Sequence, residues 1–223
     1  MKVEWQEAHP KNYREGRDGK TPDRVVIHVA EGSYSGTLAW FQNPQASVSA
    51  HFTVANDGRI GQSVSEKNTA FHSGDWGMNL RSIGIEHEGR QNAAKPWQPT
   101  EAQLDATAQL VAGICGRHGI PVDRVHLIGH NEVNPGRSAR ANCPGKGWPW
   151  DRFLALVETY MLVRPEVPKP APQPTPTPTP APDPGKRTVR LMDASTNLPL
   201  GSGSLVGDKV YIPPDVLKLL RED

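Results

Sequence analysis

Two histidines and one cysteine have the types and positions expected of metal ligands. His28 directly follows the run "RVVI", His130 directly follows "VHLIG", and both are succeeded by loop-forming residues. Cys143 lies in the stretch "GHNEVNPGRSARANCPG", whose Pro, Gly, Asn and Ser content is typical of a loop. Because α/β folds place their sites where strands end and loops begin, we expect these three side chains to meet.

Two neutral imidazoles and one thiolate are ligands that suit Zn²⁺. Three protein ligands leave the fourth position of a tetrahedral ion open, as in catalytic zinc sites. His126 is an alternative to His130, because residues four apart on a strand face the same side. It stands at mid-strand, whereas His130 follows a glycine at the strand's exit, so His130 is favoured. Cys115 falls on the apolar stripe of a helical pattern and is expected to be a core residue.

Glu86 is the candidate general base. In "RSIGIEHEG" it is the acidic residue of an otherwise apolar strand-like run. Burial at such a position raises the pKa of a carboxyl group toward the range useful for acid–base catalysis. Glu88 lies on the same face of the strand by the period of two and is the alternative base. A salt bridge to a nearby arginine is the structural alternative to a catalytic role.

Charge and apolar runs limit the classes of protein to consider. Lys and Arg number 25 against 24 Asp and Glu, without a long basic run, which argues against nucleic-acid binding. No segment approaches the roughly 18 consecutive apolar residues of a membrane span, so membrane insertion is not expected. The first residues lack the apolar core of a signal peptide, which predicts synthesis in the cytoplasm without a secretion signal. Two cysteines cannot build a disulfide framework.

A proline-rich stretch marks the clearest boundary in the chain. From Pro168 to Pro184 every second residue is proline, which excludes helices and sheet ladders and predicts a semi-rigid spacer. The sequence is therefore divided into a main domain (1–164), a Pro-rich linker (165–185) and a small C-terminal module (186–223).

The C-terminal module is expected to be β-rich. Strands are predicted near Val189–Met192 and Lys209–Ile212, with Gly-Ser turns between them and a helical turn over 215–220. A unit this small, without cysteines or a metal cluster, is below the size that usually folds alone. We expect it to pack on a copy of itself, on the main domain or on a target surface.

Strand-like and helix-like segments alternate in the main domain. The strand-like runs are "RVVIHVAEG", "RSIGIEHEG", "RVHLIGH" and a hairpin, "AHFTVANDGRIGQSV", around Asn56-Asp57-Gly58. The helix-like runs are "SGTLAWFQN" with Ser35 as its cap, a long helix from the N-cap Thr100 to a stop at Gly119, and "WDRFLALVETYML". This order predicts an α/β domain in which helices flank a mixed β-sheet.

Four separated motifs carry a resemblance to a known family. "VVIHVAEG", "SAHFTVANDGRIGQ", "TAFHSGDWGMNLRSIGIEHEG" and "GHNEVNPGRSARANCPG" occur in the order seen in zinc-dependent N-acetylmuramoyl-L-alanine amidases of type 2, which are related to peptidoglycan recognition proteins. The resemblance covers about residues 20 to 160 and implies the type-2 amidase fold. A catalytic domain followed by a proline linker and a small module resembles the layout of phage endolysins.

The resemblance implies a role for each matching residue. His28, His130 and Cys143 correspond to the three zinc ligands, although some members have Asp in place of Cys143. Glu86 corresponds to the glutamate taken as general base in the bacterial branch of the family. Bacterial peptidoglycan is the implied substrate and Zn²⁺ the implied cofactor.

Further positions are expected to line the site. His72, in "FHSGDWG", matches the stretch of the family that lines the cleft and is expected to bind substrate. Asn79 is also placed among the substrate-binding residues, and it is expected to orient the loop before the Glu86 strand. Relatives often place Lys or Thr two residues before the third ligand, where this chain has Ala141. Arg140 is therefore the predicted catalytic cation that stabilises the oxyanion, with Arg137 as the alternative.

The implied reaction is hydrolysis of the amide between N-acetylmuramic acid and L-alanine of the stem peptide. The expected setting is host lysis, in which an enzyme made in the host cytoplasm acts on the cell wall after release. A non-catalytic peptidoglycan-binding module and a cytosolic muropeptide-recycling amidase are the alternatives. Residues 186–223 are expected to bind the cell wall or to mediate self-association.

Overall fold

The computed structural model describes residues 2–91, 94, 96–133 and 142–163, together with three strands of the C-terminal module. Contacts along the chain separate two compact units, Met1–Gln173 and Pro174–Asp223. Each unit is described by itself. None of the helices among these residues is both long enough and apolar enough to cross a membrane.

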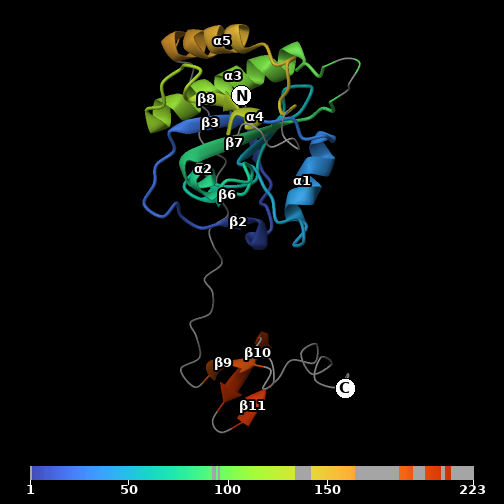
Figure 1. The fold of residues 1–223 in the computed structure, drawn as a ribbon, viewed down its shortest axis with the longest axis vertical. Helices are drawn as coiled ribbons and strands as arrows, with labels where there is room; N and C mark the ends of the chain where they lie inside the picture. Colours follow the sequence, from blue (N-terminus) through green and yellow to red (C-terminus); the bar gives the residue numbers. More distant parts are fainter. Residues whose placement is uncertain are drawn as a thin grey trace. The chain divides into compact units, whose positions relative to one another are not determined.

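The first unit is built on a six-stranded mixed sheet with the order β1-β5-β4-β7-β3-β8. Figure 1 labels its strands β7, β3 and β8, which lie side by side. All neighbouring strands in it are parallel except the antiparallel pair β4–β5. Short strands β2 and β6 form a separate antiparallel pair. The strands are β1 (Val3–Trp5), β2 (Tyr13–Arg14), β3 (Arg24–Ile27), β4 (Phe52–Val54), β5 (Ile60–Gln62), β6 (Thr69–Ala70), β7 (Ser82–His87) and β8 (Leu127–Gly129).

The predicted hairpin joins β4 to β5. The backbone N–H of Gly58 donates to Ala55 O at 2.9 Å and closes the turn. Gly58 has a φ of +86°, and a Cβ there would come 3.0 Å from the carbonyl oxygen of Ala102 in the neighbouring helix. Glycine is therefore required both by the backbone conformation and by the close approach of that helix.

The described residues of the first unit also form five α-helices and one 3-10 turn. They are η1 (Pro10–Asn12), α1 (Tyr34–Gln42), α2 (Trp76–Arg81), α3 (Glu101–His118), α4 (His130–Val133) and α5 (Trp150–Val163). α3 begins where predicted, because the Thr100 side chain accepts a bond from Gln103 N, and ends at Gly119, which has a φ of +67°. The predicted cap of α1 is wrong. Ser33 fills this role by accepting a bond from Gly36 N at 3.2 Å, and Ser35 lies inside the first turn.

The main core is formed by the sheet together with α3 and α5, and these two helices pack on each other (Figure 1). Ile27, Ile85, Leu110 and Phe153 are buried members of this core. Cys115 belongs to the same cluster, and burial raises the pKa of its thiol to about 12. The prediction that Cys115 is a core residue is thereby confirmed.

β8 is shorter than the sequence pattern indicated. It begins at Leu127, so His126 precedes the strand, and its Nδ1 lies 2.7 Å from Asp123 Oδ1. The placement of His126 at mid-strand is therefore wrong. Val125, two residues before the strand, is 63% exposed.

The second unit contains a three-stranded antiparallel sheet with the order β11-β10-β9. Its strands are β9 (Lys186–Met192), β10 (Pro199–Val206) and β11 (Lys209–Tyr211). The expectation that the segment "PLGSGSLV" forms Gly-Ser turns between two strands is wrong. The segment is the central strand β10, whose backbone pairs with β9 on one side and with β11 on the other. The predicted linker and the helical turn over 215–220 lie outside the described residues.

Candidate metal centre and active site

Strand register brings three of the predicted site residues into one row. Ile27 of β3 pairs with Ile85 of β7 on one side and with Gly129 of β8 on the other. The next residues along the three strands are His28, Glu86 and His130. Because residues in register on parallel strands point to the same face, these side chains gather at the carboxyl end of the sheet.

The imidazoles of His28 and His130 meet at this edge. Their Nδ1 atoms are 3.0 Å apart. His28 is 1% exposed, whereas His130 is only partly buried at the start of α4. Two histidines that are separated by most of the domain's sequence therefore present the same ring nitrogen to one point.

Cys143 approaches the same point from the loop before α5. Its Sγ lies 3.8 Å from His28 Nδ1 and accepts a bond from Val29 N at 3.4 Å. The backbone N–H of Asn131 donates to Cys143 O at 2.8 Å, which ties the loop to α4. An N–H donated to the sulfur stabilises its thiolate form.

The donor set fits a tetrahedral zinc ion. With Zn–N of about 2.0–2.1 Å and Zn–S of about 2.3 Å, tetrahedral geometry places two nitrogens roughly 3.3 Å apart and nitrogen and sulfur roughly 3.6 Å apart. The separations of 3.0 and 3.8 Å differ from these values by a few tenths of an ångström. One ligand atom from each of His28, His130 and Cys143 lies within 4.8 Å of the other two.

Glu86 stands beside this group of ligands. Its Oε1 lies 3.8 Å from His28 Nδ1, and its side chain is 17% exposed. Burial, with a smaller contribution from the negative charge of Glu31, raises the pKa of Glu86 to about 8. Within the described part of the chain, its Oε2 has no hydrogen-bond partner. The carboxyl group of Glu86 is thus close to the candidate ligands, and its Oε2 can still accept a hydrogen bond from a substrate or a water molecule.

Glu88, the alternative base, is engaged elsewhere. Its Oε2 accepts a bond from Asn56 N at 2.9 Å at the hairpin turn. The arrangement favours Glu86 over Glu88 as the residue that contacts the reacting groups.

His72 and Asn79, the predicted substrate contacts, both lie next to the ligands. His72 Nδ1 is 3.0 Å from His28 Nε2, and its ring is 8% exposed. Burial, with added repulsion from the charges of His130 and Arg17, lowers the pKa of His72 to about 3. Asn79 is 6% exposed, and its Oδ1 accepts bonds from the backbone of the segment that carries His72. Their contact with substrate stays a prediction.

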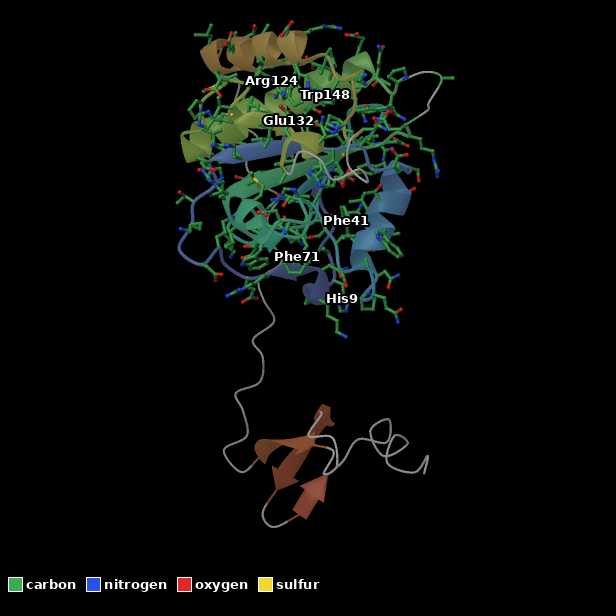
Figure 2. The ribbon with its side chains drawn as sticks, viewed as in Figure 1. His9, Phe41, Phe71, Arg124, Glu132 and Trp148 are labelled. Atoms are coloured by element: carbon green, nitrogen blue, oxygen red, sulfur yellow. The ribbon has the colours of Figure 1, made fainter. Side chains whose placement is uncertain are left out.

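A cavity of about 380 Å³ opens next to Glu86 and His72. Phe41 of α1 and Phe71, both labelled in Figure 2, line this cavity together with Trp40. Trp40 is 51% exposed. The cavity combines aromatic walls with a polar end at the ligand group, which is typical of a binding site for an organic substrate.

Glu31 is a cavity residue that sequence reasoning missed. It lines the cavity with a carboxylate that also accepts bonds from Gln91 N at 3.2 Å. Its φ of +54° is uncommon for a residue other than glycine. Its position in the loop directly after the His28 strand was the signal that could have identified it.

Arg140, the predicted catalytic cation, lies outside the described residues, as do its alternative Arg137 and the neighbouring Ala141. The oxyanion-stabilising role of Arg140 stays a prediction.

Comparison with known proteins places the fold and this site in a family. Residues 18–146 match the N-acetylmuramoyl-L-alanine amidase family. N-acetylmuramoyl-L-alanine amidase A of Achromobacter lyticus is 35% identical over 170 residues, which cover 69% of this chain and 92% of that protein. The 1,6-anhydro-N-acetylmuramyl-L-alanine amidase AmpD of Citrobacter freundii is 34% identical over 164 residues, which cover 63% of this chain and 83% of that protein.

A crystal structure of a selenomethionine AmpD derivative has the same fold. The TM-score is 0.57 with 28% identity, over 70% of this chain and 94% of that one. The predicted mixed sheet flanked by helices is thereby confirmed. Since the family match includes β3, β7, β8 and all three candidate ligands, the chain belongs to the N-acetylmuramoyl-L-alanine amidase family.

Proposed function

We propose that the chain is a zinc-dependent amidase that cleaves peptidoglycan between N-acetylmuramic acid and L-alanine of the stem peptide. The observation that carries the proposal is the convergence of His28, His130 and Cys143, with Glu86 Oε1 at 3.8 Å from His28 Nδ1. Membership of the amidase family supports the same reaction.

His28, His130 and Cys143 would hold a zinc ion, and three protein ligands are typical of catalytic zinc sites. Such an ion would supply a Lewis acid for the activation of water and the polarisation of the scissile carbonyl. The bond from Val29 N to Cys143 Sγ keeps the thiolate directed at the centre.

Glu86 moves the proton in this reaction. Its carboxylate accepts a proton from the attacking water and delivers it to the nitrogen of L-alanine as the C–N bond breaks. Burial raises the pKa of Glu86 to about 8, and a dication beside it would favour the carboxylate and lower this pKa. The side chain is therefore suited to hold a proton briefly and then release it at neutral pH.

The stem peptide lies in the cavity beside α1. Trp40, Phe41 and Phe71 provide apolar surface, and Glu31 adds a negative charge from the loop that follows β3. Exclusion of water by the aromatic walls strengthens the interactions of the buried Glu86 with the substrate. Arg140 is the cation that we propose for the oxyanion.

Two other functions fit part of these observations. A non-catalytic peptidoglycan-binding module is disfavoured by the intact set of three ligands and the adjacent Glu86. A recycling amidase acting on soluble muropeptides is favoured by the similarity to AmpD of Citrobacter freundii, whose name specifies a 1,6-anhydro-N-acetylmuramyl substrate. The proline-rich stretch favours an insoluble wall, because a spacer extends the reach of a catalytic domain.

The test is product analysis on purified cell walls with the full-length chain. We expect new amino termini of L-alanine, loss of the reaction with a chelator and recovery with added Zn²⁺. Release of reducing sugar ends, or undiminished activity in the metal-free protein, would contradict the proposal. Comparison of intact walls with soluble anhydro-muropeptides separates wall lysis from recycling.

A role for residues 186–223 in wall binding is part of the proposal, as is host lysis. A chain truncated after Arg164 should hydrolyse soluble substrate normally and sediment less with cell walls than the full-length chain. Equal sedimentation of the two chains would exclude wall binding by the C-terminal module. If the full-length chain then has the molar mass of an oligomer in solution and the truncated chain that of a monomer, the module mediates self-association.

A further inference from the structure

The two imidazoles of the candidate centre are hydrogen-bonded through the ring nitrogens that face away from it. Nε2 of His28 lies 3.0 Å from Nδ1 of His72, and Nε2 of His130 lies 3.0 Å from the carbonyl oxygen of Ser73. The two partners are adjacent residues, here called the His72–Ser73 segment. We propose that this segment sets the tautomer of both imidazoles, so that each presents an unprotonated Nδ1 to the ion. The inference rests on the proposed function, since it identifies what orients two of the metal ligands.

The tautomer of His130 follows from the chemistry of its partner. A carbonyl oxygen only accepts hydrogen bonds, so the contact with Ser73 O requires a proton on His130 Nε2. A neutral imidazole carries one ring proton, which leaves a lone pair on Nδ1. This is the nitrogen that lies 3.0 Å from His28 Nδ1.

The tautomer of His28 follows from a longer chain of hydrogen bonds. The hydroxyl of Ser82 donates its only proton to Met78 O at 2.6 Å, so its oxygen accepts from His72 Nε2 at 3.1 Å. His72 is then protonated on Nε2, and its Nδ1 accepts the proton of His28 Nε2. The lone pair of His28 Nδ1 is thereby directed toward His130 and Cys143.

Asn79 holds the segment in place. Its Oδ1 accepts bonds from the backbone N–H of His72 at 3.2 Å and of Ser73 at 2.9 Å. Asn79 belongs to α2, whose first turn is capped by the side chain of Asp75. One short helix thus positions the partners of both imidazoles, which makes His72, Ser82 and Asn79 positioning residues that need not touch the substrate.

The direct test reads the tautomers in full-length protein loaded with Zn²⁺, because without an ion the two Nδ1 atoms, 3.0 Å apart, would share a proton. Long-range ¹H–¹⁵N correlation spectra distinguish a protonated Nε2 from a protonated Nδ1 in each assigned imidazole. We expect both His28 and His130 to be protonated on Nε2. A protonated Nδ1 on either residue in the zinc-loaded protein would overturn the inference for that residue.

The second test measures zinc affinity by competition with a chromophoric chelator. His72→Phe keeps a planar ring but removes the acceptor for His28, and loss of such a partner weakens metal binding by about 10–100-fold. His72→Asn places an amide oxygen near the position of Nδ1 and should bind zinc within a few-fold of the unaltered chain. His126→Phe is the matched control, because His126 is bonded to Asp123 and should leave zinc affinity unchanged.

These results separate the inference from the proposed function. Undiminished zinc affinity in a folded His72→Phe variant, checked by circular dichroism, would overturn the role of His72. Nε2 protonation of both rings in a zinc-loaded chain that releases no amine from cell walls would support the inference and overturn the proposed reaction.

Discussion

Gly84 of β7 leaves the space that the ring of His72 occupies. A Cβ at position 84 would come 2.4 Å from His72 Cγ and 2.6 Å from its Nδ1. Gly84 stands two residues before Glu86 on the same face of the strand, so the ring of His72 packs directly on the sheet next to the candidate base. The absence of a side chain at this position is therefore a condition for the contact between His72 and His28.

Gly84→Ala should destabilise the protein and weaken zinc binding together. Forcing a methyl group into a packed interior costs typically about 1–3 kcal/mol, and the ring that must move is the partner of His28. Urea unfolding and chelator competition measure the two effects. Gly116→Ala is the control, because Gly116 lies in α3 with nothing within 4 Å of the added Cβ. That variant should be as stable as the unaltered chain or more so by roughly 0.5–1 kcal/mol.

Glu86→Gln should retain zinc and lose turnover by at least about 100-fold, because the amide cannot accept the proton from water. Initial rates of amine release from cell walls, with zinc content by elemental analysis, check both parts. Glu88→Gln is the matched control, since the Glu88 carboxylate is bonded to Asn56 N at the hairpin. Near-normal turnover of Glu86→Gln would remove Glu86 from the mechanism.

Cys143→Ser should lower zinc affinity by several orders of magnitude, because a hydroxyl is a much poorer zinc ligand than a thiolate. Equilibrium dialysis against a metal buffer gives the affinity. Cys115→Ala serves as the control for loss of a cysteine, since Cys115 is buried in the core and should affect stability alone. A full equivalent of tightly bound zinc in Cys143→Ser would exclude Cys143 as a ligand.

Acid should weaken the fold through Glu66. Burial raises the pKa of this carboxyl group, but hydrogen bonds from His118 and Arg117 outweigh burial, and the net pKa is lowered from 4.5. A carboxyl group whose folded pKa lies below its unfolded value contributes stability above the unfolded pKa and loses it as the pH falls through the folded pKa. The free energy of unfolding should therefore fall as the pH drops below about 4.5.

Glu66→Gln tests this pH dependence. The variant should lose on the order of 3 kcal/mol of the free energy of unfolding near neutral pH, because a neutral amide replaces the carboxylate that pairs with Arg117. Its free energy of unfolding should also change less with pH below about 4.5. Urea unfolding at several pH values provides the measurement. Glu101→Gln is the control, because the ion pair of Glu101 with Arg152 is exposed and should contribute little. If the free energy of unfolding falls with decreasing pH equally steeply in Glu66→Gln and in the unaltered chain, Glu66 is not the source of the acid sensitivity.

Local signals in the sequence predicted several elements correctly. Thr100 and Gly119 mark the two ends of α3, and Asn56-Asp57-Gly58 marks the hairpin, because caps and turns depend on residues only a few positions apart. The errors arose where distant contacts decide. β10 is a strand because β9 and β11 pair with it on both sides, although its Gly and Ser content is typical of turns.

The sequence alone determined the family motifs, the candidate ligands His28, His130 and Cys143, and the candidate base Glu86, because each follows a recognisable strand or lies in a recognisable loop. Only the tertiary structure decided that Ile27 is in register with both Ile85 and Gly129, which brings His28, Glu86 and His130 together. It also decided which nitrogen each imidazole turns toward the centre. Strand register and ring orientation depend on hydrogen bonds between residues far apart in the chain, and no local pattern encodes them.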